Sequence, residues 1–150
     1  MLFNCGIYRF LYGIGSYAYT SVQVGMSSIC SNNDGVYNLI DSRLINCTIN
    51  ANTRHGVYLR NGANNNLFQN IRNEWNAGVG YLADGSVGNI INGELVDRNG
   101  SANFACLMAE VFSLGMYSPS DRDEPRRQVP PITPIFTWRA LAVTSCSAMS

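Results

Sequence analysis

The sequence predicts an all-β solenoid, in which short strands stack in parallel from one coil to the next. Two observations predict it: an internal repeat of about 23 residues, and no helical periodicity between residues 20 and 110. A repeat of this length is typical of a solenoid, because one unit cannot bury its apolar face alone and packs on its neighbours. A helical repeat would need apolar residues at 3.6 spacing over about ten positions.

The repeat is clearest between residues 55–68 and 77–91, where Leu59 aligns with Leu82 and Asn66 with Asn89 at a spacing of 23. The same spacing predicts three apolar columns: Tyr58, Tyr81 and Phe104; Leu44, Leu67 and Ile90; and Ile45, Phe68 and Ile91. Upstream, a spacing of 21 aligns Tyr37 with Tyr58. Further back, the same spacing aligns Phe3, two coils before, and Val24, one coil before, with Ile45.

Each unit is predicted to contain two or three short strands with tight corners. Short apolar or alternating runs, such as 22–26 and 67–71, are separated by Gly and Asn clusters that are typical of turns. Strands that meet again one coil later run parallel, about 4.8 Å apart. Asparagine tolerates left-handed backbone and its amide both donates and accepts, so we expect Asn66 and Asn89 to form a ladder along the stack.

The segments INCTI, GVYLRNGANNN and IINGELVDRNG, at a spacing of about 23, resemble the right-handed single-stranded parallel β-helix of the pectate-lyase-like group. The resemblance covers roughly residues 3–114 and implies a right-handed parallel β-helix solenoid of about four or five coils of 21–23 residues. This group includes polysaccharide lyases, glycoside hydrolases, epimerases and phage tailspikes, and the small Asn- and Gly-rich coils most resemble a tailspike body. The resemblance implies a polysaccharide partner, a homotrimer, and a place in a virion tail or outside the cell.

Three segments are predicted along the chain. Residues 1–114 would form the β-helix, as part of a longer solenoid, because the first seven residues already fall within the repeat and leave no room for a cap. All five prolines lie between Pro119 and Pro134, which predicts an irregular linker over 115–134. Residues 135–150 form a tail for which three alternatives remain open: a short strand or helix, a segment packed on the last coil, or sequence that does not belong to the fold.

Composition favours a glycan over a nucleic acid as the partner. The formal net charge is +0, only 13% of residues are charged, and all ten basic residues are Arg. This chain lacks the basic footprint of nucleic-acid binding and suits an uncharged or mildly anionic glycan. His55 is the single histidine and no CxxC occurs, so we expect no metal and no cofactor. Neither a signal peptide nor a membrane span is visible in the sequence.

Glu74 and Asp97 are the candidate catalytic residues. They are 23 apart and should lie side by side on adjacent coils, about 5 Å apart, which is close to the carboxylate separation in a retaining glycosidase. Trp75 would offer an apolar face to a sugar ring, and Arg72 and Arg98 would hold hydroxyl or carboxylate groups. The alternative is a solvated corner at which Arg98 neutralises both acids.

The aromatic column of Tyr58, Tyr81 and Phe104 has two interpretations. It either presents an outward platform for sugars or stacks inside the coil, and the inside is favoured because the flanking row of Val57, Gly80 and Asn103 would line an interior poorly.

Three functions remain open. The chain is a polysaccharide-binding and, if the acids act, hydrolysing segment of a tailspike-like protein, a non-catalytic structural fragment of a larger spike or secreted protein, or a polysaccharide lyase or epimerase. Lyases of this group typically use an Arg or Lys base with Ca²⁺-binding carboxylates, and the absence of Lys and of an acidic cluster counts against the last.

Overall fold

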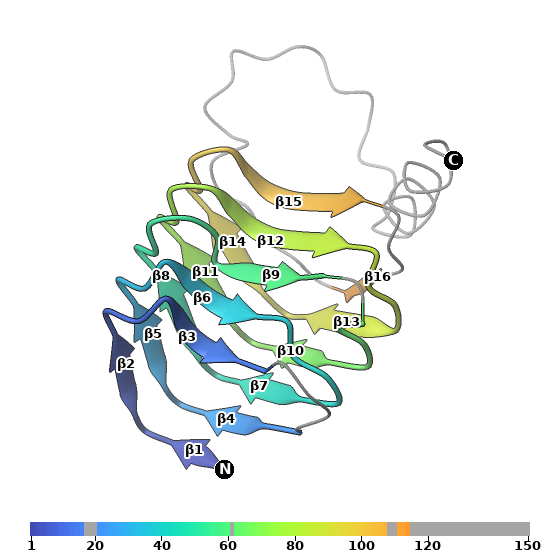
Figure 1. The fold of residues 1–150 in the computed structure, drawn as a ribbon, viewed down its shortest axis with the longest axis horizontal. Helices are drawn as coiled ribbons and strands as arrows, with labels where there is room; N and C mark the ends of the chain where they lie inside the picture. Colours follow the sequence, from blue (N-terminus) through green and yellow to red (C-terminus); the bar gives the residue numbers. More distant parts are fainter. Residues whose placement is uncertain (17–20, 61, 108–110, 115–150) are drawn as a thin grey trace.

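The computed structural model of the chain is a parallel β-solenoid of about four turns, described over residues 1–16, 21–60, 62–107 and 111–114 (Figure 1). Each turn contributes one strand to each of three sheets, so neighbouring strands in a sheet come from consecutive turns. The described residues contain strands but no helix, and therefore none that could cross a membrane. The predicted all-β solenoid is confirmed, whereas the predicted linker, 115–134, and tail, 135–150, lie outside the described residues.

Three sheets form the sides of the solenoid. Sheet A contains β1 (Leu2–Phe3), β4 (Gln23–Gly25), β7 (Arg43–Ile45), β10 (Leu67–Gln69), β13 (Asn89–Asn92) and β16 (Val111–Leu114). Sheet B contains β2 (Gly6–Tyr8), β5 (Ser28–Cys30), β8 (Thr48–Asn50), β11 (Arg72–Glu74) and β14 (Leu95–Asp97). Sheet C contains β3 (Tyr12–Gly15), β6 (Asp34–Tyr37), β9 (Val57–Leu59), β12 (Val79–Asp84) and β15 (Ala102–Leu107).

The pairing register confirms the spacing of 23 only in the later turns. There, β10 pairs with β13, β11 with β14 and β12 with β15 at that spacing. One turn earlier the spacing is 24, so Leu44 pairs with Phe68 and Leu59 pairs with Ala83 instead of Leu82. The predicted columns that join Leu44 to Leu67 and Ile45 to Phe68 are therefore wrong by one residue.

The register differs because one corner changes length between turns. Seven residues, 60–66, separate Leu59 from Leu67, whereas six residues, 84–89, separate their partners Ala83 and Ile90 in the next turn. A corner accommodates added residues while the strands stay in register with their neighbours. Further upstream, Val24 pairs with Leu44, so its predicted place in the Ile45 column is wrong by one residue. Phe3 pairs with Gly25 and Gly25 with Ile45, so Phe3 lies in the Ile45 column two turns back, as predicted.

Two corners of each turn are built from residues with left-handed backbone. Those that follow the strands of sheet A are Asn4, Met26, Asn46, Asn70 and Gly93, and those that follow the strands of sheet B are Arg9, Ser31, Ala51, Trp75 and Arg98. Their φ angles are positive, which asparagine and glycine accept readily and which is uncommon for large side chains. Trp75, with a φ of 59°, is therefore an unusual corner residue that local backbone preference does not explain.

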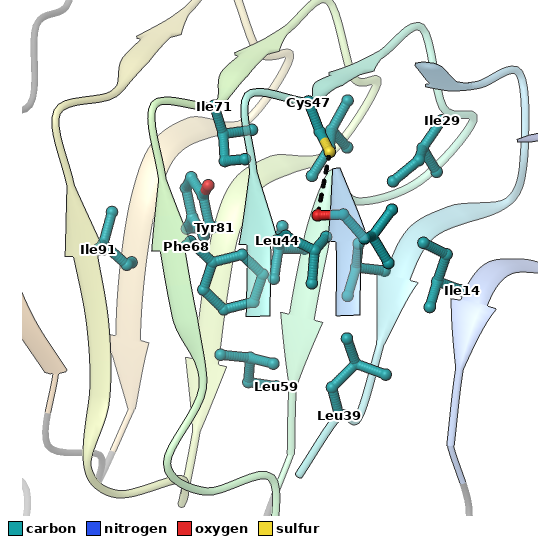
Figure 2. Close-up of a cluster of buried hydrophobic side chains, with 14 of the residues drawn as sticks. Ile14, Ile29, Leu39, Leu44, Cys47, Leu59, Phe68, Ile71, Tyr81 and Ile91 are labelled. Atoms are coloured by element: carbon teal, nitrogen blue, oxygen red, sulfur yellow. Dashed lines mark hydrogen bonds between the residues drawn. The ribbon is translucent and has the colours of Figure 1, made fainter. Parts of the chain in front are cut away.

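The interior is filled by stacked apolar side chains from all three sheets (Figure 2). Sheet A contributes Val24, Leu44, Phe68 and Ile91; sheet B contributes Ile29, Ile49 and Val96; sheet C contributes Ile14, Val36, Val57 and Tyr81. Tyr81 pairs with Val57 and with Phe104, and it is buried as predicted. Tyr58 does not share its column, because Tyr58 pairs with Leu82 and lies half-buried outside the core cluster.

Buried asparagine ladders join the turns at two corners. Asn66 Nδ2 donates to Asn89 Oδ1 at 2.9 Å, which confirms the predicted ladder. A longer ladder, not predicted from the sequence, runs between sheets B and C. Its members are Asn32, Asn52, Asn76 and Asn99, joined by amide hydrogen bonds of 3.2, 2.7 and 2.9 Å in that order.

The long ladder leaves no room for a side chain opposite it. A Cβ atom at Gly56 would lie 2.7 Å from Asn76 Nδ2 and 2.7 Å from the Gly80 carbonyl oxygen. Such contacts are closer than packed atoms tolerate, so this position requires glycine.

Candidate functional site

Glu74 and Asp97 lie side by side, as the sequence predicts. They are the last residues of β11 and β14 and pair directly across consecutive turns of sheet B. Parallel neighbours of this kind lie about 4.8 Å apart along the stack. Both residues are buried, however, so the expected alternative of a solvated corner does not describe them.

Each carboxylate is covered by its own arginine. Arg72 Nε pairs with Glu74 Oε2, and Arg98 Nε lies 3.4 Å from Asp97 Oδ2. The side chains of the two arginines are 60% and 52% exposed, whereas those of the two acids are 4% and 0% exposed. A buried carboxylate needs a cation or hydrogen bonds to compensate it, and each of these acids has a partly exposed arginine as its ion-pair partner.

Trp75 completes the group at the corner that follows β11. Its indole is 55% exposed, and the guanidinium carbon of Arg98 lies 5.0 Å from the ring centroid. This is the geometry of a cation–π contact. All five predicted site residues therefore meet at one place, which we call the Trp75 corner: Arg72, Glu74, Trp75, Asp97 and Arg98.

The Trp75 corner is built to present an indole and two guanidinium groups to solvent. The indole offers a flat apolar face, and each guanidinium offers several donors in a fixed plane. The acids orient the arginines and neutralise their charge. A direct attack by Glu74 on a glycosidic carbon would require Arg72 to move away first, because Arg72 is its ion-pair partner. Catalysis by Glu74 and Asp97 stays a prediction.

A second cluster lies on sheet C, and sequence reasoning missed it. The rings of Tyr12 and Tyr37 stack with centroids 4.0 Å apart, and the Tyr58 ring meets Tyr37 edge-on at 5.7 Å. Arg54 lies 5.4 Å from the Tyr58 ring centroid, and Arg60 Nη1 donates to the Tyr37 hydroxyl at 3.0 Å. The spacing of 21 between Tyr37 and Tyr58 was the available signal, and it was obscured by placing Tyr58 in the Tyr81 column.

His55 is held in one tautomer beside this second cluster. The Val79 N–H donates to His55 Nδ1 at 3.0 Å, and burial lowers the pKa of the imidazole, against the opposing effect of Asp34. The neutral ring therefore carries its proton on Nε2. Asp34 is fully buried, where it pairs with Arg54 and accepts a hydrogen bond from the backbone N–H of His55 at 3.1 Å. Asp34 thus fixes the Arg54 side chain and the His55 backbone.

No protein-family model matches the sequence, and no solved structure matches the chain. The function must therefore be argued from the two clusters themselves. Within the described part of the chain, no three His, Cys, Asp or Glu side chains are grouped so that they could hold a metal ion. Of the two clusters, the Trp75 corner has the more exposed aromatic residue, since Trp75 is exposed whereas Tyr12, Tyr37 and Tyr58 are half-buried or buried.

Proposed function

We propose that this chain is a polysaccharide-binding segment of a tailspike-like protein of the pectate-lyase-like group, and that it holds glycan at the Trp75 corner. One observation carries the proposal: an exposed Trp75 in left-handed backbone lies beneath the Arg98 guanidinium, and the exposed Arg72 lies on the strand that leads into it. Aromatic faces pack against the apolar faces of sugar rings, and guanidinium groups donate to hydroxyls and carboxylates. The formal net charge of +0 suits an uncharged or mildly anionic glycan.

In this proposal Glu74 and Asp97 are positioning residues. They hold Arg72 and Arg98 in place at the Trp75 corner, so little ordering is needed when a sugar binds. Hydrolysis by the same two acids is the second candidate, favoured by their direct pairing on adjacent turns, because a retaining glycosidase needs two carboxylates about 5–5.5 Å apart. Their burial beneath the arginines makes binding the stronger candidate.

The location and assembly follow from the same proposal. A tailspike-like segment would act in a virion tail or outside the cell, as a homotrimer, without a metal or a cofactor. A non-catalytic structural fragment would have the same solenoid without glycan affinity, and a lyase or epimerase would change the glycan without hydrolysing it. Size-exclusion chromatography with light scattering tests the trimer, and the glycan measurements below separate the remaining candidates.

Tryptophan fluorescence tests the proposal directly. Trp138→Phe leaves Trp75 as the single tryptophan, so its emission reports on the corner while a panel of bacterial capsular and O-antigen polysaccharides is titrated. We expect one polysaccharide class to change the emission and Trp75→Ala, measured by calorimetry, to weaken its binding at least tenfold. Met26→Ala is the matched control, because Met26 is also exposed in left-handed backbone but lies at another corner.

Two outcomes would contradict the proposal. Binding of no polysaccharide in the panel leaves the structural fragment as the function, and equal binding by Trp75→Ala and Met26→Ala moves any glycan site away from the Trp75 corner. Hydrolysis is measured separately as the release of reducing ends. If release occurs and is unchanged in Glu74→Gln/Asp97→Asn, the two acids are not catalytic.

A further inference from the structure

A third acid, Glu94, lies inside the solenoid instead of on its surface. It follows the Gly93 corner, directly before β14, and is 2% exposed. Its position continues a corner column that holds Cys47 and Ile71 in the preceding turns, since the Arg72 N–H bonds the Cys47 carbonyl and the Leu95 N–H bonds the Ile71 carbonyl, each at 3.0 Å. An acid therefore occupies a position where earlier turns place apolar or weakly polar side chains.

Glu94 makes no hydrogen bond of good geometry in this interior, although the Tyr81 hydroxyl lies close to it. Both of its carboxylate oxygens are buried without one, and so is the hydroxyl of Tyr81 on β12. In Figure 2 the Tyr81 hydroxyl lies on the Ile71 side of its ring. Among the described residues, no ion pair neutralises Glu94, and the other polar groups near this site are Asn73 on β11 and Cys47 before β8.

An acid in this position is stable only with its proton bound. A buried carboxylate without a cation loses its hydration and gains little in return. Burial raises the pKa of Glu94 to about 8, although the nearby Tyr81 hydroxyl lowers it somewhat. The pKa of Tyr81 and that of Cys47 are also raised by burial. Glu94 is therefore the group that loses its proton first.

The strand that follows Glu94 lies at the edge of its sheet among the described strands. Among the described strands, β14 pairs on one side only, with β11, whereas β13 before it pairs with both β10 and β16. Arg98, directly after β14, packs over Trp75. If β14 leaves the stack, the Trp75–Arg98 contact is lost with it.

We propose that Glu94 is a proton-operated latch for β14: the neutral acid holds this strand in the stack, and the ionised acid moves to water and releases it. The inference concerns the solenoid itself and does not depend on glycan binding. Movement of the strand hydrates the charge, and among the described strands it breaks one pairing, that of β14 with β11. The Trp75 corner is dismantled in the same event.

Hydrogen exchange and fluorescence test the latch in the full chain. We expect amide protection of β14, measured relative to β8 in the same sample, to fall between pH 6 and pH 9.5 with a midpoint near pH 8. The reference strand cancels the pH dependence of chemical exchange. In Trp138→Phe, the emission of Trp75 should change over the same pH range.

Two variants remove the acid, and a third shifts the midpoint of the transition. Glu94→Gln keeps the shape without the charge, and Glu94→Leu serves if the glutamine variant does not fold. Both should abolish the transition, whereas Tyr81→Phe should raise its midpoint, because the hydroxyl that lowers the pKa is gone. The latch is wrong if either Glu94 variant retains the transition, if β14 keeps its protection to pH 9.5 in the parent chain, or if Tyr81→Phe leaves the midpoint in place.

Discussion

Replacing Asn76 with alanine should destabilise the solenoid by about 3–5 kcal/mol, because this residue is an inner rung of the long buried ladder. Asn76 Oδ1 accepts from the backbone N–H of Asn52 at 3.1 Å and from Asn52 Nδ2 at 2.7 Å. Asn76 Nδ2 donates to Asn73 Oδ1 at 2.7 Å and to Asn99 Oδ1 at 2.9 Å. Alanine therefore leaves several buried groups with one partner fewer.

The magnitude comes from counting the groups that lose their partner. The Asn52 N–H loses its side-chain acceptor and Asn73 Oδ1 loses the donor of Asn76, while Asn52 Nδ2 keeps the Ile29 carbonyl at 3.4 Å and Asn99 Oδ1 keeps the Asn76 N–H at 3.0 Å. An unsatisfied buried donor or acceptor costs roughly 1–3 kcal/mol. Two such losses with a smaller one from Asn52 Nδ2 give the estimate, which is a large share of a typical domain's stability.

Equilibrium urea unfolding, followed by circular dichroism, measures this effect. Asn64→Ala is the control, because Asn64 Oδ1 also accepts a backbone N–H, that of Val87 at 3.0 Å, but at an exposed corner. Water replaces the lost bond there, so we expect a change within about 0.5 kcal/mol. Equal losses in the two variants, or a loss below about 1 kcal/mol for Asn76→Ala, would refute the reasoning, since water would then satisfy the ladder as well as the amide does.

Three further predictions concern stability. Because the folded chain binds the Glu94 proton with a pKa of about 8 and the unfolded chain with a pKa of 4.5, the free energy of unfolding should fall by roughly 5 kcal/mol as the pH rises from 4.5 to 8; urea unfolding of Glu94→Gln should lack this component. Gly56→Ala should lower the thermal midpoint by at least 10 °C or prevent folding, because its Cβ would collide with the ladder; an unchanged midpoint would contradict the close approach. Arg72→Gln should cost about 1–3 kcal/mol, because it leaves the Glu74 carboxylate buried without its cation; a cost no larger than that of Arg43→Gln, at an exposed arginine on β7, would show that the ion pair adds nothing.

The repeat predicted the fold and the pairing of Glu74 with Asp97 because the turns on either side of that pair have the same length. It failed upstream because corner lengths vary, and a corner such as 60–66 adds a residue to the spacing without changing the strand pattern. A single-residue error then moved Tyr58 into the wrong column and hid the cluster around it.

The burial of charged residues was the second feature that the sequence did not predict. The covering of the two acids by Arg72 and Arg98 depends on side-chain conformation, which the spacing of residues does not encode. Glu94 follows a corner glycine in a polar segment, so nothing local distinguishes it from a solvated acid. Only its place above Cys47 and Ile71, once the true register is known, reveals that it faces the interior.

The strands of each sheet succeed one another along the stack from turn to turn (Figure 1), and backbone and asparagine-ladder hydrogen bonds join each turn to the next. A force that pulls the two ends apart therefore acts on every junction between turns in series, and the weakest junction yields first. A force applied across the axis is shared by all turns at once. The solenoid should consequently withstand sideways stress well and lengthen by peeling one turn at a time.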